Sequence, residues 1–283
     1  MGHQGIRNRT SNHIKYTTEV FMEESKYIMQ NTENIVKLQK VSDTIIDFIG
    51  NEVKKRTACG IVIGLSGGLD SSVCATLAAR ALGSLAVFGL ILPDSKITPK
   101  SDVDDARELA KNLKIKYRII EIGKTKSQLL KYLPKDKLAQ GNFSSRLRMS
   151  IIYYYAGIRN LLVLGTSDKS ELKLGYYTKY GDGAADIQPM ADLYKTEVRE
   201  LAKFLQIPNQ ILKKKSSPRI WKDQTAEDEI GMPYEEIDEI LQHLETNSLH
   251  NYDSKHVKRI VSMIQKNLHK REMPPICKIR DCI

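Results

Sequence analysis

The stretch that decides the fold is residues 61–73, which read IVIGLSGGLDSSV. The short apolar run over residues 61–63 is typical of a buried parallel strand. A glycine-rich turn follows it, and residues 71–82 then have a helical pattern. Because ligands bind at the carboxyl ends of parallel strands, this order of strand, turn and helix predicts a binding loop.

The chemistry of this loop suits phosphate. A helix N-terminus presents free backbone N–H groups and a partial positive charge, and Gly67 and Gly68 let the backbone come close to an anion. The carboxylate of Asp70 would repel phosphate unless it holds Mg²⁺, which bridges carboxylate and phosphate oxygens. A serine- and glycine-rich turn near a helix N-cap is the simpler alternative. The run is neither a Walker loop nor a dinucleotide fingerprint, because it lacks both glycine spacings.

Strand and helix patterns alternate along the chain on both sides of this loop. Apolar runs predict strands at residues 85–92, 117–122 and 161–164, and apolar residues at helical spacing predict helices at residues 35–53, 102–113 and 143–158. The alternation predicts an α/β fold with an open, parallel, twisted sheet and helices on both faces. Three more stripes predict added C-terminal helices, over residues 198–205, 237–244 and 257–268. We expect residues 1–33 to form a polar extension and residues 34–283 a single domain.

Composition narrows the class of protein. The chain has 283 residues, 41% of them hydrophobic, with no apolar run of about 18 residues that would span a membrane and no signal-peptide pattern. The four cysteines form no Cys-x-x-Cys pair, so we expect reduced thiols and a cytoplasmic protein, although Cys277 and Cys282 could pair. The net charge of +10 fits a site for a polyanionic small molecule or a basic surface, and nucleic acid is the less favoured partner.

Residues 66–72 resemble the signature of the N-type ATP pyrophosphatases, which cleave ATP between the α and β phosphates and adenylate a substrate. The loop alone does not choose among NAD synthetase, GMP synthetase, asparagine and argininosuccinate synthetases and tRNA-modifying enzymes. Later segments are similar to NAD synthetase in sequence order, at residues 165–171, 175–183, 192–199, 216–219, 223–231, 234–238 and 269–275. The resemblance covers residues 35–275 and implies a Rossmann-like, adenine nucleotide alpha hydrolase-like fold.

The resemblance also implies roles for residues. It implies that ATP is bound by Gly64, Leu65, Ser66, Gly67, Gly68, Leu69, Asp70, Ser71, Thr166, Lys195 and Ser217. Asp70 and Glu171 are the implied Mg²⁺ carboxylates, and Asp70 and Lys195 the implied catalytic residues. It further implies that deamido-NAD (nicotinic acid adenine dinucleotide) is bound by Arg146, Lys179, Asp182, His269 and Lys270.

Simpler alternatives exist for several of these residues. Thr166 could cap the next turn, Glu171 and Lys195 could be surface residues, and Lys179 could pair with Asp182 to hold their loop. Residues two apart point to different sides of a helix, so at most one of Arg146 and Arg148, near the start of the helix predicted from residue 143, faces a given ligand group.

The implied reaction is that of a ligase at the last step of NAD biosynthesis. The carboxylate of deamido-NAD is a poor electrophile, so ATP adenylates it, and ammonia then displaces AMP to give NAD. Glutamine-using relatives carry an amidase domain before the loop, and this chain has only a short segment there, so we expect free ammonia, with a separate glutaminase as an alternative source. The resemblance implies a homodimer. The rival hypotheses are another ATP-pyrophosphatase ligase, GMP synthetase-like or tRNA-modifying, and a non-catalytic nucleotide- or RNA-binding relative.

Overall fold

The computed structural model describes residues 32–246 and 254–279. The chain divides into two compact units, Met1–Thr44 and Ile45–Ile283. Residues 32–55 are helical, which confirms the helix predicted over residues 35–53. The extension predicted for residues 1–33 lies almost wholly outside the described residues, so it stays a prediction, as does the single domain from residue 34. The sheet, the glycine-rich loop and the helices from α2 onward belong to the second unit.

A parallel sheet forms the centre of this unit, with strand order β3-β2-β1-β4 in the described part of the chain. The strands are β1 (Ile61–Gly64), β2 (Val87–Ile91), β3 (Lys116–Ile119) and β4 (Leu162–Val163). Every strand pair is parallel, and Ile61 lies opposite Val87 on one side and Leu162 on the other. The four predicted strands are therefore confirmed, and the strand that carries the glycine-rich loop lies between β2 and β4.

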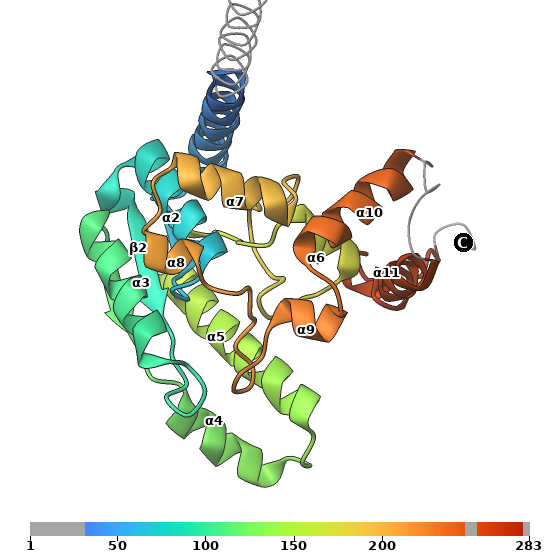
Figure 1. Ribbon diagram of the computed structural model, residues 1–283. Helices are drawn as coiled ribbons and strands as arrows, with labels where there is room; N and C mark the ends of the chain where they lie inside the picture. Colours follow the sequence, from blue (N-terminus) through green and yellow to red (C-terminus); the bar gives the residue numbers. More distant parts are fainter. Residues whose placement is uncertain (1–31, 247–253, 280–283) are drawn as a thin grey trace, which may run out of the picture. The chain divides into compact units, whose positions relative to one another are not determined.

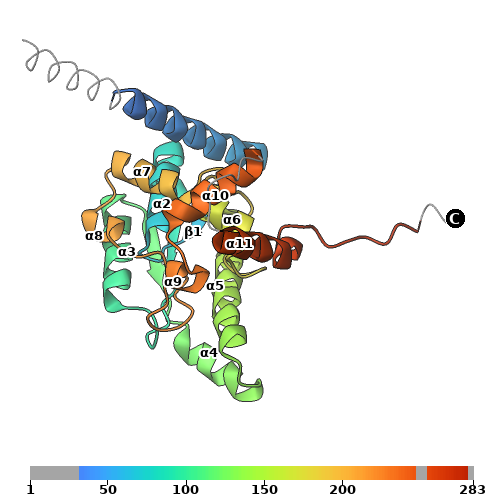
Figure 2. The same cartoon turned by 45° about the vertical axis from the view of Figure 1, so that its right-hand side comes forward.

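Helices connect the strands and cover the sheet (Figure 1). Their bounds are α2 (Leu69–Leu82), α3 (Lys100–Asn112), α4 (Gly123–Leu129), α5 (Lys137–Arg159), α6 (Lys169–Leu174), α7 (Lys195–Phe204), α8 (Asn209–Leu212), α9 (Ala226–Ile230), α10 (Tyr234–Thr246) and α11 (Ser254–Lys266), with a short 3-10 turn η3 at Leu268–Lys270. Figure 2 shows α3 and α5 on opposite sides of the sheet. The Rossmann-like α/β arrangement with added C-terminal helices is the predicted one.

Clusters of buried apolar side chains hold these layers together, and two of them bear on the site. On one face of the sheet, alternate residues of the strands, among them Val62 and Leu90, pack against Met149 and Ile152 of α5. The second core joins the C-terminal helices around Tyr234, Ile237 and other buried residues of α6, α9, α10 and α11. Burial of this kind contributes about 1.5–3 kcal/mol for each large apolar side chain. The second core therefore gives the C-terminal helices a fixed place from which to supply side chains to the sheet edge.

Helix α5 begins earlier than predicted, at Lys137 rather than near Phe143. The carboxylate of Asp136 accepts a hydrogen bond from the Ala139 backbone N–H at 2.6 Å and so caps the helix. Arg146 therefore lies in the middle of α5 and not at its start. The polar first turns of α5 hid this start, because they carry few apolar residues from which a period can be read.

The described cysteines are unpaired, and the described helices can be judged for their ability to span a membrane. Cys59, Cys74 and Cys277 are free thiols, and Cys282, the residue that could have paired with Cys277, lies outside the described residues. Within the ranges that the structure describes, no helix combines the length and the apolar character needed to cross a bilayer.

Candidate active site

The glycine-rich loop joins β1 to α2 and is organised by its own serines. The hydroxyl of Ser66 lies 3.0 Å from that of Ser71 and accepts from the Gly68 N–H at 3.2 Å. Ser72 donates to the Gly68 carbonyl at 2.7 Å. These bonds fix a tight turn in which Gly68 is the N-cap of α2. The free N–H groups of the first turn of α2 thus lie at the carboxyl end of β1, as the sequence predicts.

Gly67 is required by geometry. Its φ of 74° is in the left-handed region, and a Cβ built on it would lie 2.1 Å from the backbone oxygen of Asp102 in α3. No other residue type fits both restrictions without movement of the backbone. The loop is therefore packed directly against the start of α3.

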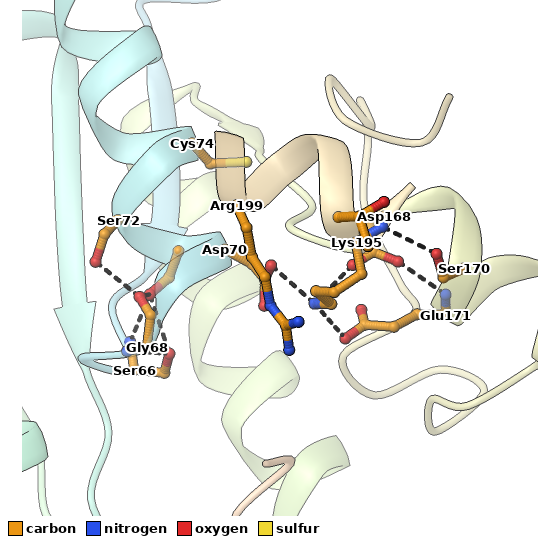
Figure 3. A network of polar contacts seen from close by, with 12 residues as sticks. Ser66, Gly68, Asp70, Ser72, Cys74, Asp168, Ser170, Glu171, Lys195 and Arg199 are labelled. Carbon is orange, nitrogen blue, oxygen red and sulfur yellow. Dashed lines mark hydrogen bonds and ion pairs between the residues drawn. The ribbon is translucent and has the colours of Figure 1, made fainter. Parts of the chain in front are cut away.

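Lys195 is the centre of the charged part of the site. Its Nζ lies 2.6 Å from Asp168 Oδ2, 2.9 Å from Asp70 Oδ1 and 3.0 Å from Glu171 Oε1, and the lysine side chain is fully buried. Figure 3 shows these side chains converging from α2, from the turn after β4 and from α6 and α7. Lys195 and Glu171 are thus not the surface residues of the simpler alternative.

The charges in this cluster control one another. Burial works to lower the pKa of Lys195, but the charges of Asp168, Asp70 and Glu171 raise it well above its usual value. Burial raises the pKa of Asp168 to about 6, an effect that Lys195 opposes and Asp70 adds to. Burial likewise raises the pKa of Glu171 well above its usual value. The ammonium of Lys195 is therefore the charge that holds three carboxylates together.

The same carboxylates fit a hard divalent cation. Asp70 and Glu171 each lie within 3.0 Å of one nitrogen, so their oxygens converge on one small volume, and three carboxylates around a single ammonium leave an excess of negative charge. In the described chain no group of three or more acidic, histidine or cysteine side chains is placed to hold a metal ion by itself. Mg²⁺ needs no such cage, since it is usually held by one or two carboxylates together with phosphate oxygens and water.

A cavity of about 240 Å³ opens beside this cluster at the carboxyl ends of β1, β2 and β4. The implied ATP and metal residues in its lining are Gly64, Leu65, Ser66, Asp70, Ser71, Thr166, Glu171 and Ser217. A smaller cavity adjoins it and is lined by Gly68, Leu69 and Lys214 as well as by Ser66, Asp70 and Ser217. The two cavities meet at the glycine-rich loop. Their position is the one expected for a nucleotide whose phosphates reach that loop.

The residues implied for deamido-NAD form a second group. Asp182 lines the larger cavity, where its Oδ1 accepts from the Ser145 hydroxyl at 2.5 Å. Arg146 Nε donates to the Lys179 carbonyl at 3.1 Å, and Lys179 Nζ donates to the carbonyl of His269. Among the described residues, Lys179 forms no ion pair with Asp182, so the simpler alternative for these two residues does not hold.

Lys270 connects this second group to the loop over residues 175–183. Its Nζ donates to the carbonyls of Gly175 and Tyr177 at 2.7 and 2.8 Å. Burial lowers the pKa of Lys270, with Asp182 opposing this and Arg146 reinforcing it, so these charges lie within reach of one another. Four of the five implied residues, Arg146, Lys179, His269 and Lys270, lie outside the lining of the larger cavity.

The structure adds residues that we did not predict for the site. Asp168 is the N-cap of α6 and accepts from the Glu171 N–H at 2.8 Å, so Thr166 is not the cap. An acidic residue three positions before a glutamate was a usable signal for such a cap. Arg148, and not Arg146, lines the larger cavity and donates to the Leu92 carbonyl at 2.9 Å. That choice depends on which side of α5 faces the cavity, which the spacing of the two arginines leaves open.

The chain is similar in sequence to known proteins over most of its length. Residues 41–274 match the family model of NAD synthase. The chain is 44% identical over 249 residues to an NH(3)-dependent NAD(+) synthetase of Archaeoglobus fulgidus, covering 88% of this chain and 100% of that one. It is 42% identical over 258 residues to the protein of the same name from Methanocaldococcus jannaschii, covering 86% and 98%.

Solved structures give the same picture. An NH3-dependent NAD synthetase from Campylobacter jejuni superposes with a TM-score of 0.76 at 39% identity, over 85% of this chain and 99% of that chain. A structure named NMN synthetase, from Francisella tularensis, superposes with a TM-score of 0.79 at 36% identity, over 85% and 98%. A glutamine-dependent NAD+ synthetase from Acinetobacter baumannii is covered over only 47% of its length.

Proposed function

The chain belongs to the NAD synthase family, and on that premise we propose that it joins ammonia to deamido-NAD at the expense of ATP. The products are NAD, AMP and pyrophosphate, and the intermediate is the adenylate of the deamido-NAD carboxyl group. The observation that carries this proposal is the convergence of Asp70, Glu171 and Lys195 beside the glycine-rich loop, inside the matched region.

The first step is adenylation. The free N–H groups at the start of α2 and the hydroxyls of Ser66 and Ser71 would bind the phosphates of ATP, and Ser217, which lines both cavities, would donate to the same phosphates. The carboxylate of deamido-NAD attacks the α-phosphorus, and pyrophosphate leaves. Lys195 would stabilise the negative charge that gathers on the leaving pyrophosphate, a task that a preorganised charge performs well.

Asp70 and Glu171 would hold Mg²⁺. The cation supplies charge neutralisation between the phosphate oxygens and the two carboxylates. The support for this assignment is the excess of carboxylate over ammonium around Lys195. Asp168 lies deeper than these two and is fully buried, so it would keep its contact with Lys195 when the outer carboxylates turn to a metal.

Binding of deamido-NAD falls to the second group of residues. Arg146, Lys179 and Lys270 would meet its anionic groups, Asp182 would accept from ribose hydroxyls, and His269 would lie over the substrate. What supports this assignment is the network of hydrogen bonds that gathers the loop over residues 175–183, α5 and η3 around Asp182.

Ammonia is the direct nitrogen donor in this proposal. It attacks the carbonyl carbon of the adenylate, and AMP leaves. The support is that relatives named NH(3)-dependent are 44% and 42% identical to this chain and are matched over almost their whole length. A separate glutaminase remains an alternative source of the ammonia. We place the reaction in the cytoplasm, for which the free thiols of the described cysteines are suited.

We also propose that the protein acts as a homodimer. Helix α5 exposes Tyr154 and Ile158, which are 65% and 60% exposed and lie one helical turn apart on one face. Apolar side chains this large and this exposed on neighbouring turns are typical of an interface. Because α5 also carries Arg146 and Ser145, a second copy packed on this helix would lie close to the deamido-NAD residues.

The test is a reaction with ATP, Mg²⁺, ammonium and deamido-NAD, read as NAD, AMP and pyrophosphate. We expect all three products in equal amounts, and ADP as a product would contradict the proposal. A second arm offers the mononucleotide acid that corresponds to NMN, because one solved relative is named NMN synthetase. Preference for that mononucleotide would show that deamido-NAD is not the substrate, whereas the adenylation and amidation steps would still be those proposed.

The variant Asp70→Asn tests the site within the same assay. We expect pyrophosphate release to fall by about 10²-fold, as when one transition-state charge partner is lost. The melting temperature should stay close to that of the parent, since Asp70 is partly exposed and Lys195 keeps two carboxylates. Near-normal turnover would remove Asp70 from the metal site.

A further inference from the structure

The segment between α8 and α9 reaches both cavities. Ser216, Ser217 and Arg219 line the larger and the smaller cavity alike. The segment has no regular secondary structure, and its ends are joined by a hydrogen bond from the Ala226 N–H to the Ser216 carbonyl at 2.8 Å. A segment without a helical or strand ladder must be positioned by its side chains.

Those side chains converge on one carboxylate, that of Asp102 in the first turn of α3. Its Oδ1 lies 2.7 Å from Lys214 Nζ and its Oδ2 lies 3.0 Å from Arg219 Nε. The Asp102 side chain is 5% exposed, so its carboxylate is shielded from water, whereas Lys214 and Arg219 are partly exposed. Each oxygen of Asp102 therefore holds one flank of the Ser216–Ser217 pair.

Asp102 is in turn fixed to the glycine-rich loop. Its backbone oxygen occupies the space that a side chain on Gly67 would need. Lys214 Nζ donates to the Gly67 carbonyl at 2.8 Å, in addition to its contacts with Asp102 and with Asp105 at 2.5 Å. The carboxylate thus links the glycine-rich loop, α3 and residues 214–219, the first part of the segment between α8 and α9.

The backbone of this segment carries strain that needs such contacts. Arg219 has a φ of 49°, in the left-handed region that a non-glycine residue rarely adopts. Its guanidinium is paired with Asp102, and its N–H donates to Ser217 Oγ at 3.2 Å. The ion pair with Asp102 and the hydrogen bond to Ser217 thus hold Arg219 in this conformation, and with it the position of Ser217.

We propose that Asp102 is a positioning residue for ATP, which seats Ser217 opposite the glycine-rich loop through Lys214 and Arg219. The proposal rests on the proposed function. Asp102 itself touches no reacting group and acts through the two cations. Loss of its charge leaves Lys214 with Asp105 and leaves Arg219 without an anionic partner in the described part of the chain, so the segment loses the anchor nearest Ser217.

The test compares Asp102→Asn with Asp104→Asn in the full-length protein. Asp104 lies on the same helix and pairs with Arg107, but this pair is 45% and 40% exposed and does not reach the segment. Trp221, the single tryptophan of the chain, lies within the segment under Lys137, so its fluorescence reports on the segment directly. The readouts are acrylamide quenching of Trp221 and the KM values for ATP and for deamido-NAD.

For Asp102→Asn we expect quenching of Trp221 to rise and the KM for ATP to rise about tenfold, which corresponds to about 1.4 kcal/mol. The KM for deamido-NAD and the helical content should stay at the parent values, and Asp104→Asn should match the parent in every readout. Asp102→Glu, which keeps the charge, should recover most of the affinity for ATP.

Unchanged quenching and unchanged KM for ATP in a folded Asp102→Asn protein would overturn the proposal, as would an equal rise of both KM values. If Asp102→Asn does not fold, Arg219→Gln replaces it, because the Arg219 side chain is partly exposed and its loss disturbs the fold less. The quenching of Trp221 and the two KM values are then measured on that variant and judged in the same way. Absence of NAD formation by the parent protein would sink the proposed function instead, and the quenching of Trp221 would still be readable.

Discussion

Lys195 holds a full charge in a place from which water is excluded. A lone buried ammonium would lose its proton, and three carboxylates without a cation would repel one another. The charged ammonium is stable only because of the carboxylates, and the carboxylates are stable together only because of the ammonium. The arrangement gathers negative charge beside the glycine-rich loop, with Asp168 fully buried and with Asp70 and Glu171 partly exposed.

Replacing Lys195 by methionine should therefore damage both stability and function. We expect the free energy of unfolding to fall by about 3–5 kcal/mol, because three carboxylates are left without a cation. Turnover should fall by about 10²-fold or more, because the variant lacks the positive charge that would stabilise the departing pyrophosphate. Urea unfolding and the NAD assay measure the two effects.

Lys203→Met on the same helix is the matched control, since Lys203 is exposed and pairs only with Glu200 among the described residues. It should change stability by less than about 0.5 kcal/mol. Magnesium should raise the melting temperature of Lys195→Met more than that of the parent, because the cation takes over the missing charge. An equal response of both proteins to magnesium would contradict the idea that Asp70 and Glu171 bind it.

At the scale of elements, sequence patterns predicted most of what positions the site. The strand ending at Gly64, the loop with two glycines and the helix after it follow from local signals, and the structure confirms them. The start of α5 was missed because its first turns are polar. The ion pairs of Asp102 with Lys214 and Arg219 join residues more than 100 positions apart, and no local signal links such positions.

The loop makes a sharp prediction at this scale. Gly67→Ala should lower stability by about 1–3 kcal/mol and weaken ATP binding, because the new Cβ meets the Asp102 carbonyl at a positive φ. Gly50→Ala is the comparison, since Gly50 lies in a helix with open space around it and should gain about 0.5–1 kcal/mol. Isothermal titration with ATP and thermal unfolding measure both. A Gly67→Ala protein that binds ATP as the parent does would show that the loop adapts.

A second prediction concerns the contact of α10 with α6. Hydrogen bonding from Lys173 lowers the pKa of Glu245 from 4.5 to about 2, and Lys169 and Tyr194 contribute. A carboxyl group with a lowered pKa in the fold stabilises it above the unfolded pKa and loses that contribution as the pH falls toward the folded one. Glu245→Gln should thus cost no more than about 1 kcal/mol near neutral pH, because the pair is partly exposed.

The pH dependence is the discriminating measurement for Glu245. The difference in unfolding free energy between Glu245→Gln and the parent should be constant above about pH 5 and should shrink as the pH falls from about 4.5 toward 2. Urea titrations at a series of pH values give this difference. Glu200→Gln, which removes an exposed pair, should show a smaller difference throughout.

At the scale of the molecule, the site is assembled from residues that the chain supplies in distant segments. Asp70 comes from the first helix after β1, Asp168 and Glu171 follow β4, and Lys195 opens α7. A parallel sheet brings the carboxyl ends of its strands to one edge, so the fold explains why these residues can meet. What the fold alone does not explain is which side chains face each other, as the exchange of Arg146 for Arg148 at the cavity illustrates.

The homodimer is the prediction that belongs to the molecule as a whole. A two-fold interface uses the same patch on both copies, so a change at two positions removes four apolar side chains from it. Tyr154→Ser combined with Ile158→Ser should therefore weaken association by about 10⁴-fold or more, given about 1.5 kcal/mol or more for each of the four side chains. Sedimentation equilibrium should show the parent at twice 32.1 kDa and the variant at 32.1 kDa.

Leu85→Ser is the control for this experiment, because Leu85 is 85% exposed and lies outside α5. It should leave the mass at that of the dimer. If the deamido-NAD site adjoins the interface, the monomeric variant should also lose affinity for deamido-NAD while its affinity for ATP stays near that of the parent, because the glycine-rich loop belongs to the connection between β1 and α2 and not to α5. A monomeric parent protein with full activity would remove the dimer from the mechanism, and α5 would then need another explanation for its exposed apolar face.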